Sequence, residues 1–160
     1  MQQQQPPVLL FKAGHLGQWH GCEFHVDETK YNCAEQYMMH GKALLMGDGE
    51  TASLIMATDS PREQKRLGRS VKNFDQTLWN EKCRNIVIEG NFAKFSQNEE
   101  LKKKLLETYP RQLAEANKND RIWGIGRDWT DPLAKDPSKW LGMNWLGECL
   151  MDVRQRIMES

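Results

Sequence analysis

Two short stretches of the sequence hold residue types that can carry acid–base chemistry. In "NCAEQYMMHGKALLMGD", Glu35 and Lys42 stand seven positions apart. Because a helix repeats every 3.6 residues, this spacing places both on one face, together with Met38 and Met39. A carboxylate and an ammonium on an apolar stripe can serve as base and acid. A simpler interpretation stays open, in which Glu35 only caps its helix and Lys42 extends to solvent.

The second stretch is "NDRIWGIG", where Asp120 and Trp123 precede two glycines, Gly124 and Gly126. A dinucleotide-binding loop would need a third glycine three positions on and a helix directly behind it, but Trp129 stands there. The glycines allow the backbone to approach a ligand, with Asp120 as an acid and Trp123 as a stacking plane. An ordinary turn that Asp120 stabilises through its own backbone fits the pattern equally well.

A third candidate is Arg69 in the cation-rich stretch "SPREQKRLGRSVKNF". Gly68 indicates a helix end or a turn there, which can direct a guanidinium toward a phosphate. A helix that faces solvent explains most of these charges equally well.

Composition narrows the class of protein. The chain has 160 residues, and its 22 basic and 22 acidic residues give a formal net charge of zero. We therefore expect one domain over residues 8–160 after a disordered tail at residues 1–7, and no overall field that attracts nucleic acid or acidic lipid. No apolar run reaches the length of a membrane span, and the start lacks the features of a signal peptide. We expect a soluble, intracellular and cytoplasmic protein that has no membrane partner.

The cysteines and histidines do not predict a metal site. The four cysteines are scattered singly, which fits free thiols in a reducing compartment. His20 and Cys22 would share one face of a strand, whereas His25 would point the other way, and no fourth ligand has a suitable spacing. We expect neither a metal nor another cofactor.

Helical signals dominate from residue 32 onward. Asn32 and Glu35 form a capping-box pattern for a helix to about Met46, and Ser60 with Pro61 starts another. Three further helices are expected at about 75–94, from a Ser96 cap to near Pro110, and at about 144–158.

Strand signals are few and lie mainly early in the chain. Residues 22–31 read as a hairpin, and residues 9–11 could pair with it, whereas residues 113–116 are ambiguous between a strand and a helix end. Residues 117–139 form a long irregular segment that contains Trp123 and Trp129, so an ordered binding loop is expected there.

Five ordered blocks resemble a known family. They are "YNCAEQYMMHGKALLMGD", "SPREQKRLGRSVKNF", "LWNEKCRNIVIEGNFAKFSQNEELKKKLLET", "LAEANKNDRIWGIG" and "WLGMNWLGECLMDVR". Together they are similar to the NADAR family of N-glycosidases, also called the YbiA-like family, over Phe11 to Arg154. The resemblance implies a mainly α fold, a single compact helical domain with a few short β-strands near the N-terminus.

The resemblance also implies which residues form the site. Its polar positions fall on the candidate catalytic residues Glu35, Asp120 and Lys42, and on the candidate binding residues Trp123, Gly124, Gln18, Trp19 and Asn144; Arg69 joins the binding group from the residue pattern alone. The sequence departs from the family pattern at two positions, where Gly41 precedes Lys42 and Ala114 precedes Glu115.

The implied reaction is hydrolysis of an N-glycosidic bond to ribose. Its transition state carries positive charge on the sugar, so an anion must lie near the sugar and a proton or cation near the departing base. Glu35 or Asp120 is expected to serve the sugar, and the other acid or Lys42 the base, with Trp123 stacking on a ring.

Two substrates are implied, ADP-ribosylated guanine in nucleic acid and ribosylated intermediates of riboflavin synthesis. We expect the first, because a modified base can be recognised locally and no riboflavin-pathway domain accompanies the motifs. A noncatalytic module that binds ADP-ribose is a further alternative.

Overall fold

The computed structural model describes residues 7–160, and these form two compact units that we describe separately. The first is Gln18–Glu99, and the second combines residues 7–17 with Glu100–Ser160. The predicted disordered tail lies outside the described residues except for Pro7, and the expectation of one domain stays a prediction. No helix in the described part is long and apolar enough to cross a membrane.

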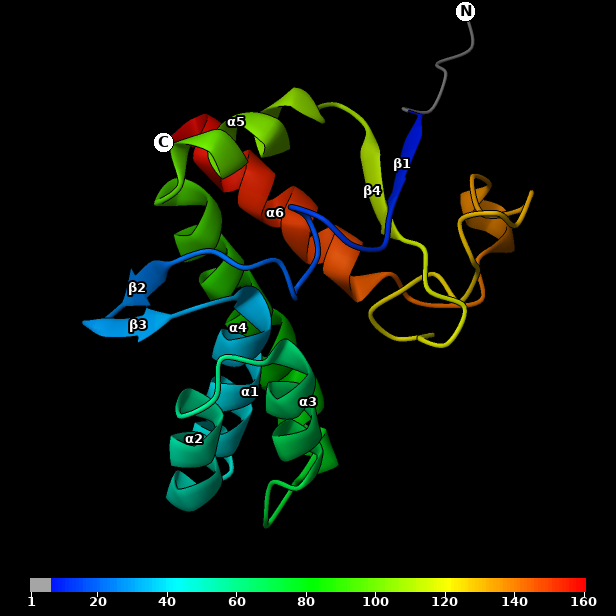
Figure 1. The fold of residues 1–160 in the computed structure, drawn as a ribbon. Helices are drawn as coiled ribbons and strands as arrows, with labels where there is room; N and C mark the ends of the chain where they lie inside the picture. Colours follow the sequence, from blue (N-terminus) through cyan, green and yellow to red (C-terminus); the bar gives the residue numbers. More distant parts are fainter. Residues whose placement is uncertain (1–6) are drawn as a thin grey trace, which may run out of the picture. The chain divides into compact units, whose positions relative to one another are not determined.

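The first unit is a group of helices with one hairpin (Figure 1). In chain order its elements are β2 (Phe24–Val26), β3 (Thr29–Tyr31), α1 (Ala34–Leu45), α2 (Gly49–Met56), α3 (Pro61–Arg69) and α4 (Gln76–Ser96). Helix α1 packs against α2, α3 and α4, and α4 packs against β2. The strands β2 and β3 pair antiparallel with Phe24 opposite Tyr31, which confirms the predicted hairpin.

The helix starts follow local capping, with two corrections. Ser60 and Asp75 accept hydrogen bonds from first-turn amides of α3 and α4. The predicted Asn32 cap is wrong by one residue, because the side chain of Cys33 caps α1. The predicted Ser96 cap is also wrong: Ser96 is the last residue of α4, and its hydroxyl donates to the carbonyl of Phe92. Helix α2 is an element that the sequence pattern did not predict.

Two buried glutamines join the first turn of α1 to α3. Gln64 Nε2 donates to Asn32 Oδ1 at 3.1 Å and to the carbonyl of Thr58 at 2.9 Å, while Cys33 Sγ donates to Gln64 Oε1. Gln36 Oε1 accepts from the backbone N–H of Asn32 at 2.8 Å, and its Nε2 donates to the carbonyl of Thr58. Both amide groups are therefore satisfied inside the unit, as buried polar groups must be.

Glycines let the neighbouring helices approach α1 closely. A Cβ at Gly41 would lie 2.9 Å from Ile86 Cγ2 on α4, and a Cβ at Gly68 of α3 would overlap Met39 Sδ. This explains why a glycine precedes Lys42 in the middle of a helix, where it costs helix propensity.

The second unit is built around a parallel strand pair and helix α6. Its elements are β1 (Val8–Phe11), α5 (Glu99–Glu107), β4 (Gln112–Glu115), the short 3-10 helix η1 (Pro137–Lys139) and α6 (Trp145–Glu159). The strands β1 and β4 lie side by side with Val8 opposite Gln112 (Figure 1). The predicted pairing of residues 9–11 with the hairpin is therefore wrong, and the ambiguous residues 113–116 belong mainly to a strand. Helix α6 packs on β4.

The apolar stripe that the sequence predicts along α6 is buried, with Leu146, Leu150, Val153 and Ile157 all part of the core. With six α-helices and four short strands among the described residues, the predicted mainly α fold is confirmed.

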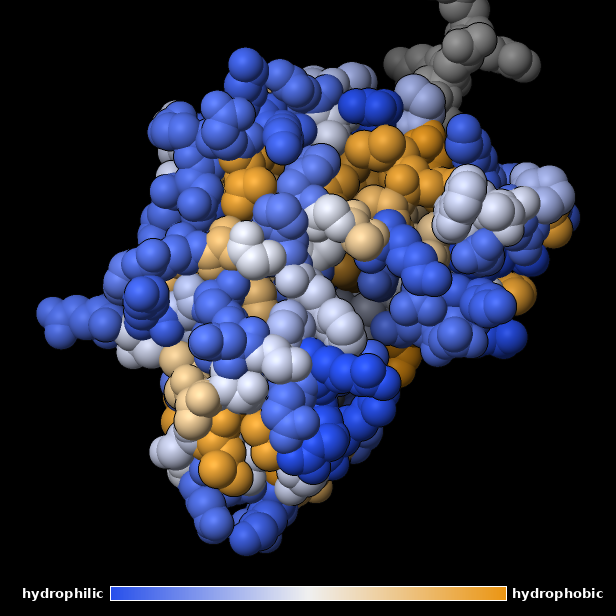
Figure 2. Space-filling view, in the orientation of Figure 1, coloured by the Kyte–Doolittle hydropathy of each residue, from blue (hydrophilic) through white to orange (hydrophobic). Residues whose placement is uncertain are grey.

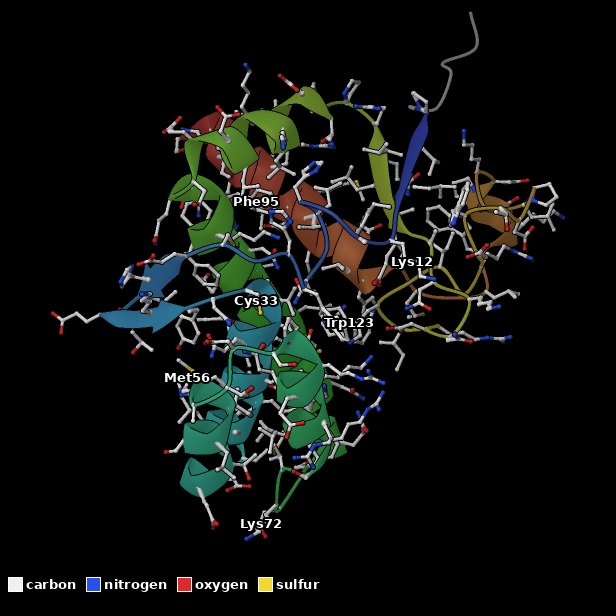
Figure 3. The ribbon with its side chains drawn as sticks, viewed as in Figure 1. Lys12, Cys33, Met56, Lys72, Phe95 and Trp123 are labelled. Atoms are coloured by element: carbon white, nitrogen blue, oxygen red, sulfur yellow. The ribbon has the colours of Figure 1, made fainter. Side chains whose placement is uncertain are left out.

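Lys94 on α4 is fully buried, which is unusual for a lysine. Its ammonium lies 4.8 Å from the centroid of the Phe95 ring, and Figure 3 shows Phe95 near the C-terminal end of α4. Burial lowers the pKa of Lys94 to about 8, against a smaller opposing effect of the Cys22 and Cys33 thiols. The folded protein thus holds this proton less tightly than the unfolded chain does.

We predict that replacing Gln64 by leucine destabilises the protein by roughly 2–4 kcal/mol, because several buried groups lose their partners at once. Urea denaturation measures the change. Gln76→Leu is the matched control: Gln76 is exposed and its side chain donates to Asn80 one turn along, so its replacement should change stability by less than about 0.5 kcal/mol. Equal effects of the two substitutions would contradict the role of the buried amides.

We also predict that Lys94 makes stability rise with pH. Between about 8 and 10.5 the unfolded chain binds the proton more than the folded protein does, so the free energy of unfolding increases as pH increases. The gain attributable to Lys94 is on the order of 3 kcal/mol. Urea denaturation of the wild type and Lys94→Met across this range tests it. Parallel pH curves would refute the assignment.

Candidate functional site

Glu35 and Lys42 lie along one face of α1, as their spacing predicts. Glu35, the second residue of the helix, is only 6% exposed, and Met38 and Met39 beside it are buried. Lys42 is half-buried, and we find it between two aromatic rings.

The Lys42 ammonium lies 4.8 Å from the centroid of the Phe74 ring and 5.5 Å from that of Trp79. Such distances give cation–π attraction. Lys42 therefore does not simply extend into water. Sequence reasoning missed both rings as site residues: Trp79 lies within the helix predicted at about 75–94, and Phe74 lies in the irregular segment before α4, where periodicity carries no signal.

Burial and two neighbouring charges shift the pKa of the Lys42 amine. Burial is the largest effect and lowers the pKa of the Lys42 amine. The carboxylate of Glu35 raises this pKa and the guanidinium of Arg69 lowers it. The structure thus brings Glu35, Lys42 and Arg69 together, with Arg69 in the last turn of α3, where a helix end was predicted.

The capping interpretation of Glu35 is wrong in its detail. The side chain that reaches back to the residue before the cap is that of Gln36, which accepts the N–H of Asn32. The backbone N–H of Glu35, in the first turn of α1, donates to the carbonyl of Gln18 at 2.9 Å. The reciprocal position next to the helix start is therefore taken by Gln36.

Gln18 and Trp19 precede this helix start. Gln18 Oε1 accepts a hydrogen bond from Asn91 Nδ2 on α4 at 2.9 Å, and Gln18 Nε2 lies 3.7 Å from Met38 Sδ on α1. Gln18 thus borders the stripe that carries Glu35. Trp19 is 48% exposed and available for stacking.

In the second unit, the Asp120 carboxylate organises a tight turn. Its Oδ1 accepts hydrogen bonds from the backbone N–H groups of Ile122 at 2.9 Å and Trp123 at 2.8 Å. The turn interpretation of Asp120 therefore holds, and any chemical role would be additional to it.

The loop that carries Asp120 also caps α6 with its backbone. The N–H groups of Trp145 and Leu146 donate to the carbonyls of Ile122 and Trp123 at 3.1 Å each. A phosphate at this helix start would have to displace them. The glycines serve this packing, since a Cβ at Gly142 would overlap the carbonyl oxygen of Gly124.

Trp123 and Asn144 have well-defined surroundings in this unit. The Trp123 ring meets that of Trp145 edge to face, with centroids 5.7 Å apart, and Figure 3 labels Trp123 on the loop after β4. Asn144 is buried, and its amide bonds to the backbone of Leu113 and Glu115 on β4. Its binding role stays a prediction, beside a structural role that is evident.

The predicted site residues thus form two groups. Gln18, Trp19, Glu35, Lys42 and Arg69 belong to the first unit, and Asp120, Trp123, Gly124 and Asn144 to the second. Among the described residues, no group of three or more His, Cys, Asp or Glu side chains could hold a metal ion.

Comparison with known proteins gives consistent results. The family model described as the NADAR domain matches residues 8–158. The Caenorhabditis elegans protein irg-1 is 41% identical over 130 residues, which are 80% of this chain but only 61% of that protein. An N-glycosidase of Acanthamoeba polyphaga mimivirus is 45% identical over 127 residues, 79% of this chain and 75% of that protein.

More distant bacterial relatives extend the match. The N-glycosidase YbiA of Escherichia coli is 29% identical over 132 residues, 82% of this chain and 74% of that protein. The NMR structure of E. coli YbiA superposes with a TM-score of 0.79 at 25% identity, covering 98% of this chain and 88% of that one.

We predict that Asp120 stabilises its turn through the position of its oxygen and not through its charge. Asp120→Ala removes the acceptor of two backbone N–H groups and should cost roughly 1–2 kcal/mol of stability. Asp120→Asn keeps an oxygen in the same place and should stay within about 0.5 kcal/mol of the wild type. Urea denaturation of the three proteins measures both; an Asn variant as unstable as the Ala variant would show that the charge, not the turn geometry, matters for folding.

Proposed function

Because the chain belongs to the NADAR family, we propose that it is an N-glycosidase that removes ADP-ribose from guanine bases in nucleic acid. The mimivirus and bacterial relatives are named N-glycosidases, which supports hydrolysis of an N-glycosidic bond without specifying the substrate. The observation that carries the proposal within this chain is the buried Glu35 carboxylate, which acts electrostatically on a half-buried Lys42.

The chemistry needs an anion and an acid. As the bond between C1′ of ribose and the base nitrogen breaks, its electrons pass to the base and positive charge develops on the sugar. In the proposal, the Glu35 carboxylate stabilises this charge and takes a proton from the water that adds to C1′. Burial strengthens this attraction severalfold over that in bulk water.

Lys42 supplies the acid in this scheme. A half-buried ammonium with a lowered pKa releases its proton more readily than an ordinary lysine does. It can therefore donate to the departing base, which becomes more basic as it leaves. Asp120 is the second carboxylate of the proposal, but we place the first step at Glu35 because Asp120 Oδ1 already holds two backbone amides.

The charges near Glu35 favour the ADP-ribosylated substrate. The guanidinium of Arg69 acts electrostatically on Lys42, and ADP-ribose carries a diphosphate that a guanidinium can bind through two hydrogen bonds. A ribosylated riboflavin intermediate, with a single phosphate, is the second candidate, and its support is the same Glu35 and Lys42 chemistry on a smaller ligand. A noncatalytic ADP-ribose-binding module is the third candidate.

Turnover assays separate these candidates. The purified protein is incubated with an oligonucleotide that carries ADP-ribosyl-guanine and, separately, with a ribosylaminopyrimidine phosphate, and released ADP-ribose or base is measured. Turnover of the first substrate is expected. Turnover of only the second would favour the riboflavin intermediate, and binding of ADP-ribose without turnover of either would favour the binding module.

We predict that Glu35→Gln lowers kcat at least about 100-fold, because the amide keeps the size of the side chain but removes its charge and its ability to accept a proton. Glu81→Gln, which changes an exposed acid on α4, is the matched control and should retain wild-type turnover. Thermal melting verifies that both variants fold. A folded Glu35→Gln protein with the wild-type rate would remove Glu35 from the mechanism.

A further inference from the structure

Helix α3 carries a stripe of cations along its outer face. Arg62, Lys65, Arg66 and Arg69 occur at i, i+3, i+4 and i+7, and all four are exposed. We call these four residues the α3 stripe. Figure 2 shows strongly hydrophilic residues gathered over this helix. The opposite face of α3 is fixed in the unit by the buried Gln64 and by Gly68.

The first half of the stripe is unfavourable for the helix that carries it. Like charges three and four residues apart repel, and among the described residues Arg66 is the stripe residue that forms an ion pair with an acid, Glu63. Arg66 and Arg69 also lie in the last turn, where the helix dipole favours cations, so the cost falls on Arg62 and Lys65. Arg62 also stands in the first turn, where the helix dipole favours an acid instead of a cation. Local costs without a structural return are typical of functional surfaces.

A partly exposed aromatic ring, that of Phe74, follows the C-terminal end of the stripe. Arg69 acts electrostatically on Lys42, whose ammonium lies over the ring of Phe74. Phe74 is 41% exposed, so part of its ring is open to solvent. A row of cations that ends near an exposed aromatic ring matches single-stranded nucleic acid, which needs cations for its phosphates and flat rings for its bases.

We propose that the α3 stripe binds the phosphates of the substrate next to the Glu35–Lys42 pair: Arg62, Lys65 and Arg66 bind the backbone of a single-stranded nucleic acid, and Arg69 binds the diphosphate of ADP-ribose. From Arg62 to Arg66 the helix rises about 6 Å, the length of about two stacked nucleotides. The net charge of the chain is zero, so the proposed binding depends on the cations of α3 and not on a general attraction of the protein to polyanions. The assignment deepens the proposed function, on which it rests for its substrate class.

The test measures binding without requiring turnover. Fluorescence anisotropy gives the affinity for an unmodified single-stranded oligonucleotide of roughly ten nucleotides across a series of salt concentrations. The proteins are the wild type, the double variant Arg62→Gln with Lys65→Gln, and a matched control, Lys103→Gln with Lys104→Gln, which removes the same charge from exposed positions on α5.

The expected result is specific to α3. The double variant should bind on the order of ten-fold more weakly than the wild type at about 0.1 M salt. The negative slope of log K against log salt should become shallower by about 1.4, because two phosphate contacts are lost and each contributes about 0.7 on a single strand. The α5 control should match the wild type. Because removing like charges relieves repulsion, the α3 variant should melt no lower than the wild type.

Three results would overturn the stripe assignment: equal affinities of the α3 and α5 variants, no salt-dependent binding by the wild type, or preferential binding of the wild type to vesicles with anionic headgroups. Failure of the two proposals can be told apart. Binding through α3 without hydrolysis of ADP-ribosyl-guanine would overturn the function and leave the stripe. Hydrolysis of free ADP-ribosyl-guanosine without oligonucleotide binding would do the reverse.

Discussion

The unit formed by Gln18–Glu99 depends on two buried amides. Gln36 on α1 and Gln64 on α3 both form a hydrogen bond with Asn32, and both donate to the carbonyl of Thr58 in the segment before α3. A buried amide tolerates few geometries, because each missing partner costs the full desolvation of a polar group. The network therefore fixes both the start of α1, where Glu35 lies, and the face that α3 turns outward.

Close packing around α1 explains the electrostatics of Lys42. Glycines at 41 and 68 allow α4 and α3 to approach α1 so closely that a methyl group would not fit. The amine of Lys42 is therefore drawn away from water, and burial becomes the largest influence on its pKa. Glu35 opposes this by favouring the charged form. In the proposed mechanism, this lowered pKa is what lets Lys42 donate its proton.

Local sequence signals predict most of the helices, but contacts between residues far apart in the chain cannot be predicted from them. Ser60 was assigned correctly as a cap, since a cap is decided by a hydroxyl and an amide three residues apart. The α1 cap lies one residue later than predicted: Asn32 Oδ1 accepts from Gln64 Nε2, and Cys33 Sγ accepts the first-turn N–H of Gln36. The pairing of β1 with β4 joins residues about one hundred positions apart, which no local pattern encodes. Among the site residues, spacing alone placed Glu35 and Lys42 on one face, whereas the ring of Phe74 reaches Lys42 only through the tertiary fold.

The described helix starts also bear on how this protein can recognise phosphate. Helix starts are common anion sites, because their first amides lack partners. Here a side chain already accepts a first-turn amide in α1, α2, α3 and α4, and in α6 the carbonyls of Ile122 and Trp123 do so. Recognition by the dipole of one of these helices would first have to break those bonds. Cationic side chains face no such competition, and on α3 they are concentrated on one exposed face, which is why the proposal gives phosphate binding to them.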